Sequence, residues 1–141
     1  MKKTILTLAS GLLLSTSVYA ADMAKGLNVI LTTKDTQTQM MAMVLAMNTM
    51  KLKKEVNIVL CSNAGDLADK NISSQNMKPI NKSPKMLLQG LIKKGASVKV
   101  CPLYLPNASK DKSILIDGVS VAKPNEVATK LMEKGYKILS Y

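Results

Sequence analysis

The chain has 141 residues, which suffices for one domain, and its 20 basic residues, all lysines, outnumber nine acids. It contains no histidine, so Ser-His-Asp and Cys-His catalytic systems are excluded and the commonest zinc ligand is missing. The absence of arginine removes the side chain that binds phosphate most specifically, and the scarcity of aromatic residues argues against nucleic-acid binding.

The first 20 residues are typical of a signal peptide. Lys2 and Lys3 precede a mostly apolar run from Ile5 to Leu14, and Val18-Tyr19-Ala20 suits cleavage by signal peptidase. Cleavage predicts an exported, periplasmic protein comprising residues 21–141, with no later apolar run long enough to span a membrane. This segment keeps 18 lysines and nine acids, a formal net charge of +9. Because the lysines are scattered, we interpret them mainly as a solvated surface.

Apolar runs and helical patterns alternate through the first half of the remaining chain. A run rich in β-branched residues at 27–32 predicts a strand. Residues 33–35 offer a helix N-cap, and the segment from there through Leu52 lacks Gly and Pro, which predicts one long helix. Residues 55–60 predict a second strand, and the polar residues 62–81 predict a long connection.

The same alternation continues to the C-terminus. A helix is predicted from Ser83-Pro84 to Gly95, because serine can cap it, proline fits its first turn and glycine ends it. A third strand follows at 96–100. Residues 113–121 predict either a hairpin around an Asp-Gly pair or a helical turn leading into one strand. A last helix at 123–133 precedes a terminal strand at 136–140.

This order of elements predicts a single α/β domain over residues 21–141. Strands that alternate with helices cross over right-handedly, which produces a mainly parallel sheet with helices on both faces. In such sheets the functional crevice lies beyond the carboxyl ends of the strands. Cys61 and Cys101 each directly follow a predicted strand, so we expect both at that edge.

Three interpretations of the two cysteines are open. In an exported chain they are expected to form a Cys61–Cys101 disulfide, which would staple a non-catalytic binding or assembly module. In a sheet of order 2-1-3, however, their strands would lie about 10 Å apart, so the loops would have to bend to bring the sulfurs together. Alternatively, Cys101 is a reactive thiolate that carries sulfane sulfur as a persulfide, chemistry that needs no histidine base.

The third interpretation is a Cys/Met copper-handling protein. Four methionines recur at spacings of three and four, with Met41 beside them, and thioethers suit Cu(I). The four are Met40, Met43, Met47 and Met50. We favour a hydrophobic core or a subunit interface for this stripe, because methionine readily fills gaps where phenylalanine is absent.

Two further patterns bear on ligands. Gly65-Asp66 begins a long loop beside Cys61, and loops of this length are often lids or binding loops. No glycine-rich phosphate loop follows the first predicted strand, where Thr32-Thr33-Lys34-Asp35 stands instead. We therefore expect no nucleotide cofactor.

Three segments of the chain together resemble the DsrE/DsrF-like family. They are GASVKVCP at 95–102, LIDGV at 115–119 and KILSY at 137–141. The resemblance implies a flavodoxin-like open sheet, homo-oligomers, and sulfur relay through the cysteine at this strand end, which is Cys101. Many relatives carry a Cys-x-x-Cys pair here, whereas this chain has Cys101-Pro102-Leu103-Tyr104, so Cys61 is the candidate for the missing second thiol.

The resemblance and the predicted export together give the functional expectation. We expect a periplasmic DsrE-like sulfur carrier, sulfurtransferase or thiol-redox protein, in which Cys101 accepts sulfur and Cys61 resolves or holds it. Its expected partners are a second copy of the chain and either a sulfur donor or acceptor protein or a small sulfur compound. We expect no metal and no cofactor.

Overall fold

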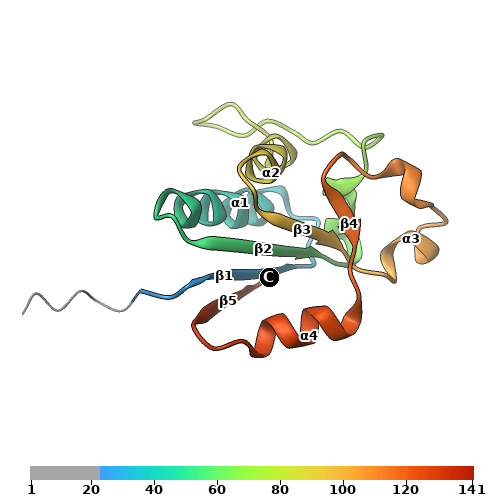
Figure 1. Ribbon diagram of the computed structural model, residues 1–141. Coiled ribbons are helices and arrows are strands. Elements are labelled where there is room, and N and C mark those ends of the chain that lie inside the picture. Colours follow the sequence, from blue (N-terminus) through green and yellow to red (C-terminus); the bar gives the residue numbers. More distant parts are fainter. Residues whose placement is uncertain (1–22) are drawn as a thin grey trace, which may run out of the picture.

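A computed structural model describes residues 23–141, so the predicted signal peptide, residues 1–20, lies outside the described residues. Five parallel strands form one sheet with helices on both faces (Figure 1). The strands are β1 (Gly26–Leu31), β2 (Glu55–Leu60), β3 (Ser97–Val100), β4 (Val119–Val121) and β5 (Tyr136–Ser140). The helices are α1 (Thr36–Lys51), α2 (Pro84–Lys93), α3 (Tyr104–Asn107) and α4 (Pro124–Met132), with 3-10 helices η1 (Ser62–Ala68) and η2 (Lys112–Ile114).

The ends of the two long helices follow from local sequence. The Asp35 carboxylate accepts a hydrogen bond of 2.7 Å from the Thr38 N–H and caps α1. The Ser83 hydroxyl accepts one of 3.2 Å from the Met86 N–H and caps α2, whose first residue is proline. Gly95, with φ +94°, adopts the left-handed conformation just beyond α2, where glycine is favoured. The predicted bounds of both helices are thus confirmed to within a few residues.

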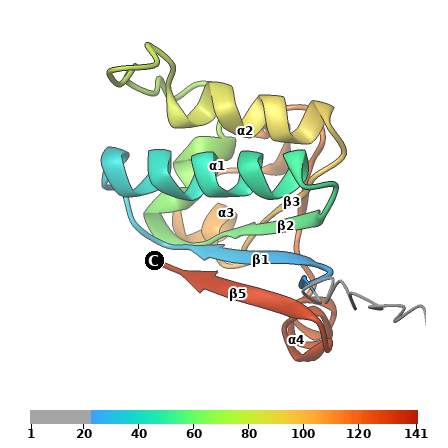
Figure 2. The ribbon, with the colours of Figure 1, turned by 90° about the vertical axis from the view of Figure 1, so that its left-hand side faces the viewer.

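The strand order is β4-β3-β2-β1-β5, and every neighbouring pair is parallel. The chain steps from β1 to β4 in one direction, with α1 and α2 on one face of the sheet, and then returns to the opposite edge through α4 (Figures 1 and 2). Because right-handed crossovers in opposite directions place their helices on opposite faces, α4 covers the other face. The expected α/β sheet with helices on both faces is confirmed, but an order of 2-1-3 is wrong, since β2 and β3 are neighbours.

The main core lies between the sheet and helices α1 and α2. Of the methionine stripe, Met40 and Met43 are buried there, and Met47 and Met50 pack against the same core. Met41 is 52% exposed and points away from it. The interpretation of the stripe as core is therefore confirmed.

The segment from residue 113 to residue 121 forms a helical turn and one strand, so the hairpin alternative is wrong. Leu115 forms a β-bridge with Asp69, and the Ile116 N–H donates to the Ala68 carbonyl at 2.8 Å. The backbone groups of Leu115 and Ile116, which would pair across a hairpin, instead pair with residues at the end of η1. Within residues 23–141, no helix is both long and apolar enough to cross a membrane.

Candidate functional site

Both cysteines lie at the carboxyl edge of the sheet, at the ends of adjacent strands. The Cys61 N–H donates to the Leu31 carbonyl at 2.8 Å, and the Cys101 N–H donates to the Leu60 carbonyl at 2.8 Å. Each cysteine thereby continues its strand by one residue beyond the last paired position. Because β2 and β3 are neighbours, this backbone ladder brings the two cysteines together at one edge.

The two thiols share a hollow of about 530 Å³. Both are half-buried, and neither forms a disulfide in the structure. Neighbouring strands lie about 4.8 Å apart, which is within the range that a disulfide tolerates, so the geometry allows the pair to bond on oxidation. The hollow is lined by Cys61, Ser62, Asn63, Asp66, Cys101, Leu103, Tyr104, Asn107 and Ala108.

The surroundings of Cys61 keep its proton on the sulfur. Burial, together with the charge and hydrogen bonding of the neighbouring Cys101 side chain, raises the pKa of the Cys61 thiol to about 11. The thiolate is the nucleophilic form of cysteine, so Cys61 is a weak nucleophile at neutral pH. Of the two thiols, Cys61 is therefore the poorer candidate for a nucleophile.

We expect the alkylation of Cys61 by iodoacetamide to be slow at pH 7 and to accelerate up to a pH of about 11. Cleavage after lysine separates the two cysteines, because Lys70 and Lys99 lie between them, so mass spectrometry can follow each thiol independently. In the Cys101→Ser variant the profile should move to lower pH, since the contribution of Cys101 is removed. If the alkylation rate of Cys61 in the unmodified protein instead has its midpoint at about pH 8.5, the ordinary pKa of a thiol, this account is contradicted.

A polar network borders the hollow beside the cysteines. The Tyr104 hydroxyl donates to Asp66 at 2.7 Å and accepts a hydrogen bond of 3.2 Å from the Lys110 ammonium. Lys110 also pairs with the buried Asp69 at 2.7 Å. Burial, together with the hydrogen bond to Asp66, raises the pKa of Tyr104 to about 12, so its hydroxyl keeps its proton.

Tyr104, Asp69 and Lys110 were not among the sequence candidates, although Tyr104 stands three residues after Cys101, where many DsrE/DsrF-like proteins carry a second cysteine. Its ring packs directly on Gly65: a Cβ at residue 65 would lie 2.3 Å from the ring. Only glycine allows this close approach. The segment at Gly65-Asp66, predicted as a loop, belongs to the 3-10 helix η1, which buries Gly65 and lines the hollow with Ser62, Asn63 and Asp66.

The placement of the methionines gives no support to the copper interpretation. The methionine stripe packs in the core and contributes no residue to the hollow around Cys61 and Cys101. Among residues 23–141, no three side chains of His, Cys, Asp or Glu gather closely enough to hold a metal ion.

Comparisons with known proteins identify the fold. No protein-family model matches the chain, and no curated protein matches it in sequence. The solved structure of the ychN protein from E. coli superposes with a TM-score of 0.68 at 18% identity, covering 84% of this chain and 100% of that one. The protein of unknown function MTH1491 from Methanobacterium thermoautotrophicum superposes with a TM-score of 0.61 at 12% identity, covering 82% of this chain and 99% of that one. The expected DsrE-like α/β fold is thus confirmed.

Proposed function

We propose that this protein is a periplasmic sulfur carrier or sulfurtransferase in which Cys101 accepts sulfane sulfur and Cys61 resolves it. The observation that carries the proposal is the pair of unbonded thiols at the ends of two adjacent parallel strands, facing one hollow. The DsrE-like fold supports it as well, because sulfur relay in that family uses the cysteine at this strand end. Export is proposed from the N-terminal sequence pattern alone.

Loading requires only the thiolate of Cys101 and a sulfane-sulfur donor such as thiosulfate. The thiolate attacks the outer sulfur of thiosulfate, a new S–S bond forms to Cys101, and the bond between the two thiosulfate sulfurs breaks. Sulfite leaves with the electron pair, so the charges balance and no oxidant is needed. The formal net charge of +9 on residues 21–141 favours the approach of such an anion.

Release uses the second thiol. Cys61 attacks the Cys101 sulfur, a Cys61–Cys101 disulfide forms, and the carried sulfur leaves as hydrosulfide with the proton from Cys61. An external dithiol then returns the pair to two thiols by supplying two electrons. Because the pKa of Cys61 is raised to about 11, resolution is slow at neutral pH, and the persulfide persists long enough to be passed to an acceptor.

The test is the intact mass of the reduced protein before and after incubation with thiosulfate. The expected result is a gain of one sulfur atom that maps to the peptide containing Cys101 and disappears on treatment with dithiothreitol. A protein that instead loses only two hydrogens on oxidation, and gains no sulfur from any donor, would support the structural-disulfide alternative. Cell fractionation of the producing bacterium, with detection of the cleaved chain, tests the export.

A further inference from the structure

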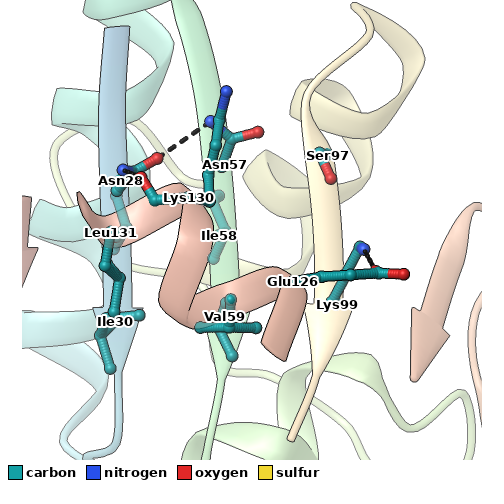
Figure 3. A pocket seen from close by; sticks show the side chains of 12 residues that line it. Asn28, Ile30, Asn57, Ile58, Val59, Ser97, Lys99, Glu126, Lys130 and Leu131 are labelled. Atoms are coloured by element: carbon teal, nitrogen blue, oxygen red, sulfur yellow. Dashed lines mark hydrogen bonds and ion pairs between the residues drawn. The ribbon is translucent and has the colours of Figure 1, made fainter. Parts of the chain in front are cut away.

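A second cavity lies on the other face of the sheet, between the strands and α4 (Figure 3). It has a volume of about 180 Å³ and contains neither cysteine. Its floor is a row of three polar residues in register on neighbouring strands, Asn28 on β1, Asn57 on β2 and Ser97 on β3. Asn57 is four residues before Cys61, about 13 Å along the strand, so this cavity is separate from the thiol site.

The remaining lining of the cavity consists of apolar side chains and the three charged residues Lys99, Glu126 and Lys130. Ile30 and Val59 line it from the sheet, and Val127 and Leu131 line it from α4. All four side chains are half-buried. An apolar cavity of about 150 Å³ in another protein accommodates benzene, so this one has room for a molecule with one six-membered ring.

The hydrogen bonds of Asn28 determine which atom Asn57 presents to the cavity. Asn28 is only 2% exposed, and its Nδ2 donates to the Lys130 carbonyl at 2.9 Å, which cannot itself donate. Its Oδ1 must therefore face Asn57, whose Nδ2 donates to it at 3.0 Å. This leaves the Asn57 Oδ1 as the outward atom, and within residues 23–141 the Asn57 side chain makes only the hydrogen bond that its Nδ2 donates. Since no buried side-chain oxygen of the described residues lacks a partner, this oxygen is open to solvent and can accept a hydrogen bond from a ligand. Figure 3 shows this oxygen on the side toward Ser97.

The charges around the cavity are already paired. Lys99 and Glu126 form an ion pair of 2.8 Å across one end, and Lys130 pairs with Glu133 at 2.9 Å. A charged ligand would have to break one of these pairs or enter apolar surroundings without a partner, which is costly. The cavity therefore favours a neutral ligand, and the free Asn57 oxygen favours one that donates a hydrogen bond.

We propose that this cavity is a binding site for a small, neutral, planar molecule that carries one O–H or N–H donor. The ring lies between the β1 and β2 side chains and α4, and its donor bonds to the Asn57 Oδ1, with the Ser97 hydroxyl beside it. The site is independent of the sulfur chemistry at Cys101. Ligand selection rests on the orientation that the Lys130 carbonyl imposes on both asparagines.

Phenol is the probe, because it has one ring and one donor, and toluene is the matched probe without a donor. In a titration of the purified protein followed by amide NMR shifts, we expect phenol to bind with a Kd on the order of 1 mM, as suits seven heavy atoms. The shifts should concentrate at Asn57, Ser97, Val127 and Leu131. Toluene should bind about fivefold or more weakly, because it leaves the Asn57 oxygen unpaired. Benzoate should not bind.

Filling the cavity tests its location. Val59→Phe on β2 and Leu131→Phe on α4 should each fill the cavity and abolish phenol binding. One such variant that keeps the native amide spectrum is enough for the test. Ile138→Phe is the matched control, because Ile138 is exposed on β5 and outside the cavity, and it should leave the Kd unchanged. Cys101→Ser should also leave it unchanged, which separates this site from the proposed function.

Three results of the probe titrations would overturn the proposal. They are the absence of phenol shifts at the cavity, equal binding of phenol and toluene, and unchanged phenol binding by a correctly folded cavity-filling variant. Concentration-dependent shifts of the same residues without any probe would also overturn it, because a second copy of the chain would then occupy this face.

Discussion

Replacing Cys101 by serine is expected to abolish the gain of a sulfur atom from thiosulfate. Serine is nearly the same size, and neither thiol is bonded in the structure, so the fold should be retained. A hydroxyl cannot replace the thiolate as the nucleophile that attacks sulfane sulfur. Intact mass after incubation with the donor measures the effect directly, with the loss of loading as the readout.

The matched variant is Cys61→Ser, which should still gain one sulfur at Cys101. Because it lacks the resolving thiol, its persulfide should accumulate and no sulfide should be released, whereas the unmodified protein should release sulfide as the disulfide forms. Measuring sulfide in solution distinguishes these results. Loading of Cys61 in the Cys101→Ser protein would show that the roles assigned to the two cysteines are wrong.

The Cys101→Ser variant also tests the alternative in which the two cysteines form a structural disulfide. If the two cysteines form a permanent staple, closing a loop of about 40 residues contributes roughly 4 kcal/mol. Cys101→Ser would then lower the free energy of unfolding by about that amount under oxidising conditions and by little in the presence of reductant. Under the proposed function the resting pair is two thiols, so the protein as isolated and the variant should unfold at nearly the same urea concentration even without added reductant.

Replacing Asp69 by asparagine is expected to lower the free energy of unfolding by about 3 kcal/mol at neutral pH. The Asp69 side chain is 2% exposed and pairs with Lys110 at 2.7 Å, and it also accepts a hydrogen bond of 2.8 Å from the Asn71 N–H. Asparagine can keep the bond from Asn71 but leaves the Lys110 charge without its closest partner. Because Lys110 also holds the Tyr104 hydroxyl, the wall of the cysteine hollow should loosen as well.

The effect of this substitution should depend on pH. Burial by itself would raise the pKa of Asp69, but the hydrogen bonds from Lys110 and Asn71 and the charges of Lys110 and Lys85 outweigh it and lower the pKa below its ordinary value. A lowered pKa in the folded state stabilises the protein above the unfolded-state pKa of about 3.9, and this contribution is lost as the pH falls through the folded-state value. The stabilities of the two proteins should therefore differ most above about pH 5 and converge in strong acid.

Urea unfolding at pH 7, 5 and 3 measures this difference. Asp117→Asn is the matched control, because Asp117 is exposed and forms no ion pair with any residue that the structure describes; it should change the stability by less than about 0.5 kcal/mol. A difference between Asp69→Asn and the unmodified protein that is the same at all three pH values would contradict the role assigned to the carboxylate.

The sequence by itself determined the elements and the placement of the cysteines on them. Helix caps such as Asp35 and Ser83 act within three residues, and the strand patterns before Cys61 and Cys101 are likewise local, so both could be predicted from neighbouring residues. The right-handed crossover rule then sufficed to place both cysteines at one edge of a parallel sheet.

Only the tertiary structure decided which strands are neighbours and what surrounds the thiols. The β2–β3 pairing, the contact of Tyr104 with Gly65 and the pairing of Asp69 with Lys110 join residues that are about 40 positions apart in the sequence. The atom that Asn57 presents to the cavity under α4 depends on the amide orientation of Asn28, which the carbonyl of Lys130, 102 residues away, determines. Such contacts depend on how the elements pack together, and local sequence patterns do not carry that information.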